Sequence, residues 1–223
     1  MITEDNSMIK KQGPPTRISV SQINCFSSCP LKFSFQYIKK LKPVTTSFAM
    51  GNGLKVHDLI AKNIFDHGDE DIDASLKIAK EYLENFSSDE ECLTEHKLTG
   101  HICNKPTLGI YDKLFPKLAT AVDWKNGKDA PYKRWGFNIQ AYIYSILYEQ
   151  NFDNKPLEKF DFVFFGSNTI YSPPVNTDKF KDKCQKYIEN VIELAYCEDG
   201  KYPKKESPLC NYCSYQSICS IFD

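Results

Sequence analysis

Three charged residues in the middle of the chain have the types and spacing of a metal-dependent hydrolytic site. Asp123 and Lys125 are two positions apart, so in a strand their side chains project from the same face. Asp112 lies on the preceding strand-like run and reaches the same edge if the two strands pair through a turn at residues 115–117. Two carboxylates offer the oxygen ligands that Mg²⁺ or Mn²⁺ prefers, and a neighbouring lysine can polarise a water or balance an oxyanion.

Each of these residues also has an ordinary structural interpretation. An aspartate followed two positions later by a lysine is common on solvated strands, although Val122 and Trp124 place this pair in a buried-type strand. Gln140 and Tyr144 share a helix face and could contact a phosphate or orient the lysine, or they could be a half-buried pair. His57 lies beside an apolar helix face, where a histidine is either a packed residue or a metal ligand.

Cysteines at both ends of the chain form a second candidate site. Cys210, Cys213 and Cys219 have C-x2-C-x5-C spacing, and Cys29 lies near the start in Cys-Pro-Leu-Lys-Phe, with Cys25 as an alternative partner. Four thiolates suit zinc or an iron–sulfur cluster about equally by count. Such a site would tie the two chain ends together and so lower the entropy of the unfolded chain.

Composition sets broad limits on the class of protein. The 223 residues are 41% hydrophobic and 26% charged, which is typical of a globular chain, and the net charge of −1 neither suggests nor excludes DNA binding. We find no apolar run of membrane-spanning length and no signal-peptide pattern, and therefore expect a cytoplasmic protein without a membrane partner. In that compartment the nine cysteines do not indicate a disulfide framework.

The helices and strands that must position these residues are predicted from the periodicity of hydrophobic residues and from the helix-breaking residues proline and glycine. We expect a polar tail over residues 1–17 and a single domain over 18–223. Its parts are a helical part at 18–88, an α/β core at 89–170, and a C-terminal helix with the cysteine loop at 171–223. The predicted strands lie near 91–98, 106–113, 117–125 and 160–165, and the main helices near 19–29, 33–41, 54–64, 72–86, 132–149 and 176–197. This order predicts an α/β fold with an N-terminal helical extension.

Six motifs in order resemble one nuclease family. They are Cys29-Pro-Leu-Lys-Phe, Gly51-x-Gly53-x3-His57, Gly109-x2-Asp112, Asp123-x-Lys125, Gln140-x3-Tyr144 and the final C-x2-C-x5-C. Together, over about residues 18–219, they resemble the RecB-like PD-(D/E)XK exonucleases. The resemblance is to their iron–sulfur branch, which includes the CRISPR-associated RecB-like exonucleases and the AddB nuclease domain. It implies a restriction-endonuclease-like core, with a mixed central sheet flanked by helices, and an iron–sulfur clasp.

The resemblance also implies a role for each matching position. His57, Asp112, Asp123 and the Val122 carbonyl would bind Mg²⁺ or Mn²⁺, and Lys125 would be the catalytic lysine. Gln140 and Tyr144 would support the active site and DNA binding. A [4Fe–4S] cluster would be bound by Cys29, Cys210, Cys213 and Cys219. Asp123 stands where many relatives have glutamate, and Asn126-Gly127 replaces the more usual Thr-Gly.

The expected function is metal-dependent exonuclease cleavage of single-stranded DNA or DNA ends. Lys32, Lys133 and Arg134 are candidates for binding the phosphate backbone. The biological setting would be recombination and repair, CRISPR adaptation or phage DNA processing. The alternatives are a nuclease-fold subunit that acts through a protein partner, such as an adaptation complex or a helicase, and a DNA-binding module without catalysis. The chain has no G-x4-GK[ST] loop and so no helicase motor of its own.

Overall fold

The computed structural model describes residues 15–43, 48–196 and 201–219, which form two compact units. We call residues 17–20 and 48–189 the core unit. The terminal unit comprises the remaining described residues, from both ends of the chain. Among the helices that the structure describes, none is long and apolar enough to cross a membrane.

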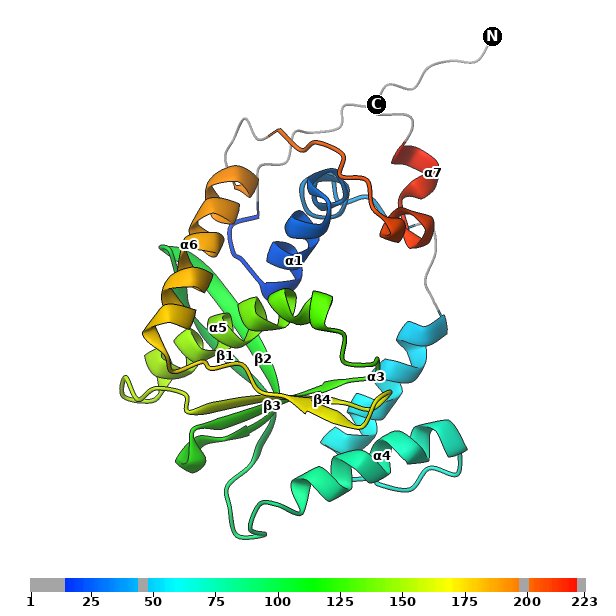
Figure 1. Cartoon of the computed structure of the whole chain (residues 1–223), viewed down its shortest axis with the longest axis vertical. Coiled ribbons are helices and arrows are strands. Elements are labelled where there is room, and N and C mark those ends of the chain that lie inside the picture. Colours follow the sequence, from blue (N-terminus) through cyan, green and yellow to red (C-terminus); the bar gives the residue numbers. More distant parts are fainter. Residues whose placement is uncertain (1–14, 44–47, 197–200, 220–223) are drawn as a thin grey trace. The chain divides into compact units, whose positions relative to one another are not determined.

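The core unit is built on a five-stranded mixed sheet whose strands neighbour one another in chain order (Figure 1). Its strands are β1 (Leu93–Ile102), β2 (Lys105–Phe115), β3 (Thr120–Lys125), β4 (Lys159–Phe164) and β5 (Thr169–Tyr171). All neighbours are antiparallel except β3 and β4, which are parallel because α5 (Arg134–Asn151) forms the crossover between them. The predicted mixed α/β core is therefore confirmed, whereas the short strand β5 was not anticipated.

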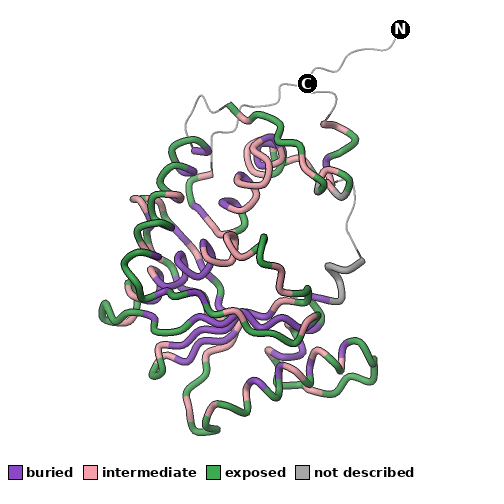
Figure 2. Tube along the Cα trace, viewed as in Figure 1, coloured by how far each residue is buried: buried purple, intermediate pink, exposed green. Residues whose placement is uncertain are grey.

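Helices cover both faces of this sheet. On one face, Tyr144 and Phe137 of α5 pack against Phe160 and Phe162 of β4, with ring centroids 5.6 and 5.1 Å apart. On the other face lie α3 (Phe48–Ala61) and α4 (Glu70–Leu83), whose buried apolar residues pack with Trp124. The buried residues consequently lie along the strands and on the helix faces that pack against them (Figure 2).

Element boundaries follow local capping and turn chemistry. Asp69 begins α4 as its N-cap, because its side chain accepts hydrogen bonds from the backbone N–H groups of Asp71 and Ile72. The hairpin between β2 and β3 was predicted, but β3 begins later than expected. Pro116–Leu118 forms a 3₁₀ turn and Ala119 takes a left-handed φ of 46° before the strand can start.

The terminal unit joins the two ends of the chain by hydrogen bonds. Its N-terminal part contains most of α1 (Val20–Ser28), then α2 (Pro30–Phe33) and a π-helical turn at Ser34–Ile38, where one continuous helix was expected over 33–41. Its C-terminal part contains a 3₁₀ turn at Pro208–Tyr212 and α7 (Gln216–Cys219). The Leu31 N–H donates to the Pro203 carbonyl at 3.2 Å, and the Tyr215 hydroxyl donates to the Leu41 carbonyl at 3.0 Å.

A fully buried carboxylate fastens α4 to the sheet. Asp161 of β4 is 0% exposed and accepts hydrogen bonds of 2.5 Å from the hydroxyls of both Tyr82 and Ser172. Lys159 Nζ lies 2.7 Å from its Oδ2 atom. Burial, reinforced by the charge of Asp161, raises the pKa of Tyr82, so this hydroxyl remains a donor.

We expect Tyr82→Phe to lower the free energy of unfolding by about 1.5–3 kcal/mol, because a buried carboxylate loses one of its donors. Urea denaturation followed by circular dichroism measures this change. Tyr132→Phe is the matched control: Tyr132 is 82% exposed, and its loss of a hydroxyl should change stability by no more than about 0.5 kcal/mol. Equal stability losses in the two variants would show that the Asp161 network contributes nothing.

Candidate active site

The first part of the site lies where the pairing of β1 with β2 is interrupted. Thr94 pairs with Lys113 and His96 pairs with Tyr111, and Glu95 and Asp112 lie between these two pairs. Glu95 has a φ of 47°, in the left-handed region that residues other than glycine rarely adopt. Both carboxylates therefore sit at an irregular point in otherwise regular strands.

The direction of the β2 side chains changes at this point. Tyr111 packs against Tyr144 of α5, with ring centroids 4.6 Å apart. Lys113, two positions later, instead donates to Asn63, which follows α3, at 3.4 Å. Residues two apart in a regular strand share a face, so the face switches at Asp112. The switch leaves the Asp112 carboxylate beside α3 and β3.

Asp112 has two partners from those elements. Its Oδ2 atom accepts the backbone N–H of Trp124 at 2.8 Å and lies 3.4 Å from Nδ1 of His57 on α3. Burial acts to lower the pKa of His57, but the hydrogen bond and charge of Asp112, with the charge of Asp123, outweigh it and raise that pKa. His57 is thus an imidazole held against a carboxylate, as a ligand or a counter-ion would be.

Gly53 allows α3 to approach the loop after β3. A Cβ atom at Gly53 would lie 2.3 Å from Nδ2 of Asn126, so any larger residue would force the Asn126 side chain to move. Gly53 precedes His57 by one helical turn, and Asn126 directly follows Lys125. Close packing against Asn126 therefore explains why the second glycine of the Gly-x-Gly-x3-His pattern is a glycine.

The second part of the site joins Asp123 and Lys125 of β3 to Gln140 of α5. Lys125 Nζ lies 2.6 Å from Asp123 Oδ2 and donates to Gln140 Oε1 at 3.1 Å. The Gln140 amide donates to the other oxygen of Asp123. The predicted common face of Asp123 and Lys125 is confirmed, and Gln140 bridges the two side chains.

Asp123 is a buried carboxylate in a crowded electrostatic environment. It is 6% exposed, and burial raises its pKa, with Lys125 acting in the opposite direction and Asp112 adding to the rise. Its Oδ2 atom is buried and forms the ion pair with Lys125, but has no hydrogen bond of normal geometry within the described residues. A buried oxygen of this kind suits a divalent cation, which needs carboxylate ligands.

Lys125 is further held by two aromatic rings. Its Nζ atom lies 5.5 Å from the ring centroid of Phe137 and 5.4 Å from that of Phe162. Contact of an ammonium group with ring faces at this distance is attractive. The lysine is thereby positioned by groups from α5, β3 and β4.

Tyr144 packs beside this group rather than entering its ion pairs. Its hydroxyl accepts the Ile110 N–H at 3.3 Å, and Gly109 makes room for its ring, which a Cβ atom would meet at 3.0 Å. Burial, then the charge of Asp123, raises the pKa of Tyr144 and keeps it protonated. Val122 is buried on β3, opposite Lys113 of β2.

The structure adds Glu95, which the sequence analysis did not identify. Within the part of the chain that the structure describes, one trio of potential metal ligands has its atoms within 4.8 Å of one another: His57, Glu95 and Asp112. Asp123 is not a member of this trio. The sequence around Glu95 alternates as in an ordinary strand and does not mark it as a ligand. Only the strand register, which places Glu95 opposite Asp112, identifies it.

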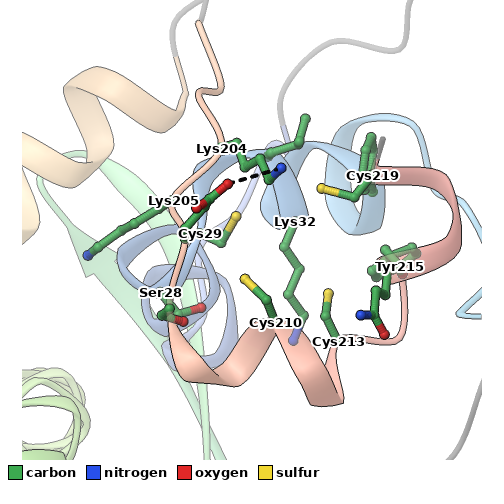
Figure 3. A pocket seen from close by; sticks show the side chains of 14 residues that line it. Ser28, Cys29, Lys32, Lys204, Lys205, Cys210, Cys213, Tyr215 and Cys219 are labelled. Carbon is green, nitrogen blue, oxygen red and sulfur yellow. Dashed lines mark ion pairs between the residues drawn. The ribbon is translucent and has the colours of Figure 1, made fainter. Parts of the chain in front are cut away.

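The four predicted cysteines line one cavity in the terminal unit. Cys29, Cys210, Cys213 and Cys219 surround a cavity of about 450 Å³, which we call the cysteine cavity (Figure 3). Cys25 is not among its lining residues, and burial raises the pKa of its thiol to about 11. Cys29 and Cys213 lie near enough to Cys25 for their charges to add to this rise, so the cavity lining alone separates Cys29 from Cys25.

The three candidate DNA-binding cations belong to both units. Lys32 lines the cysteine cavity of the terminal unit. In the core unit, Lys133 lies over the Tyr132 ring at 5.7 Å. Arg134 pairs with Asp129 at 2.6 Å.

Comparison with known proteins agrees with this architecture. A crystal structure of a Eubacterium rectale protein named "Putative exonuclease" superposes with a TM-score of 0.59 at 16% identity, covering 95% of this chain and 98% of that chain. The structure of the protein SSO0001 gives 0.50 at 14% identity, covering 92% and 86%. No curated protein sequence matches the chain significantly. The family model of the PD-(D/E)XK nuclease superfamily matches residues 17–105 and 109–220, and the chain therefore belongs to that superfamily.

Proposed function

We propose that this chain is a divalent-metal-dependent exonuclease that hydrolyses phosphodiester bonds in single-stranded DNA or at DNA ends. The observation that carries the proposal is the convergence of Asp112, Asp123 and Lys125 beside His57 in a chain of this superfamily. Exonuclease action is also in the name of the Eubacterium rectale protein that shares the fold. We expect its setting to be recombination and repair, CRISPR adaptation or phage DNA processing.

The residues present fit a divalent cation. His57, Asp112, Asp123 and the Val122 carbonyl would bind it, and Asp123 would offer its buried Oδ2 atom, which lies against Lys125 Nζ. When bound, the cation would lower the pKa of a water and neutralise charge on the phosphate.

Lys125 supplies a fixed positive charge next to this position. Gln140 and Asp123 hold its ammonium group by direct contacts, so the charge needs little reorganisation when an anionic phosphate arrives. Gln140 contacts both other residues and acts as a positioning residue for them.

We further propose that the cysteine cavity binds a [4Fe–4S] cluster through Cys29, Cys210, Cys213 and Cys219. Four thiolates can bind zinc or an iron–sulfur cluster, and the cavity of about 450 Å³ that these four cysteines line has room for the larger group. The cluster would reinforce the hydrogen bonds that already join the two chain ends.

We expect Lys125→Ala to lower the rate of DNA degradation at least about 100-fold, because the fixed charge at the reacting phosphate is lost. The measurement is Mn²⁺-dependent release of label from end-labelled single-stranded DNA by anaerobically purified protein. Lys128→Ala, at an exposed lysine three positions later, should retain wild-type activity. Degradation by Lys125→Ala at the wild-type rate would contradict the proposed centre. An inactive wild type would favour the partner-subunit alternative.

We expect Cys213→Ser to lower iron content, visible absorbance and the melting temperature together, because one cluster ligand is removed. Iron analysis and thermal denaturation of the purified protein measure these changes. Cys103 lies in the turn between β1 and β2 of the core unit, and Cys103→Ser should leave iron content, visible absorbance and melting temperature unchanged. Stoichiometric zinc without iron in the wild type would contradict the cluster.

A further inference from the structure

His57, Glu95 and Asp112 approach one another from α3, β1 and β2. Their ligand atoms all lie within 4.8 Å of one another. His57 and Asp112 are half-buried, and Glu95 is the exposed member of the trio. A cation arriving from solvent would therefore meet Glu95 at the open side of the group.

The backbone of β1 is irregular at the residue concerned. The left-handed φ of 47° at Glu95 interrupts the regular alternation of the strand, while the pairs on either side keep the same register. As a result Glu95 faces Asp112 at the point where β2 also changes face. Glutamate does not favour this conformation, so the surrounding structure imposes it.

The carboxylates of this region differ in their cationic partners. Asp112 Oδ2 lies 3.4 Å from Nδ1 of His57, and Asp123 Oδ2 lies 2.6 Å from Nζ of Lys125. Glu95 makes no ion pair within the described residues. A divalent cation bound between Glu95 and Asp112 would supply that partner.

We propose that Glu95 is a further ligand of the divalent cation, which it would bind together with His57 and Asp112. One imidazole and two carboxylates form a donor set that suits Mn²⁺ or Mg²⁺. Asp123 and the Val122 carbonyl would complete the ligand set from β3, and Lys125 would face the reacting phosphate. This inference rests on the proposed metal-dependent nuclease function.

The test is Mn²⁺ binding to the full chain, measured by isothermal titration calorimetry without DNA. Glu95→Gln should bind Mn²⁺ at least about tenfold more weakly than wild type, and Asp112→Asn should also lose affinity. Glu91→Gln is the matched control, because Glu91 is an exposed glutamate just before β1. It should bind Mn²⁺ as wild type does.

Thermal denaturation separates a ligand from a structural residue. Without metal, Glu95→Gln should melt at or above the wild-type temperature, because charge repulsion is relieved, while the Mn²⁺-induced rise in melting temperature should shrink. Wild-type affinity in Glu95→Gln, with affinity lost in Asp112→Asn, would overturn this inference and leave the proposed function intact. Absence of Mn²⁺ binding in the wild type would overturn both.

Discussion

The candidate active site depends on compensating the electrostatic repulsion between carboxylates that lie close together. Asp112 and Asp123 each carry negative charge in a partly or fully buried position, and the charge of Asp112 raises the pKa of Asp123. Such an arrangement is unfavourable unless donors and cations compensate it. That compensation comes from three elements: His57 on α3, the Trp124 N–H and Lys125 on β3, and the Gln140 amide on α5.

This requirement explains why helices from both faces of the sheet meet the same edge. His57 comes from α3 on one face, and Gln140 comes from α5 on the other. Gly53 and Gly109 allow the close approaches that bring these helices near β3 and β2. The site therefore depends on backbone packing as much as on its charged residues. A divalent cation fits this balance as the remaining positive partner.

The local parts of the site could be predicted from the sequence because they follow strand and helix periodicity. The common face of Asp123 and Lys125 needs only the two-residue repeat of a strand. The hairpin that brings Asp112 near them follows from the proline-containing turn. Glu95 could not be predicted, since its role depends on a left-handed backbone angle and on a partner in another strand. The π-helical turn at Ser34–Ile38 likewise has no simple sequence pattern.

The most direct measurement is anomalous diffraction at the manganese edge from crystals of the wild-type protein soaked in Mn²⁺. The account predicts a peak within ligand distance of the Asp112 carboxylate, beside Asp123. Manganese peaks confined to other parts of the molecule, with the Asp112 carboxylate still bound only by the Trp124 N–H and His57, would contradict it.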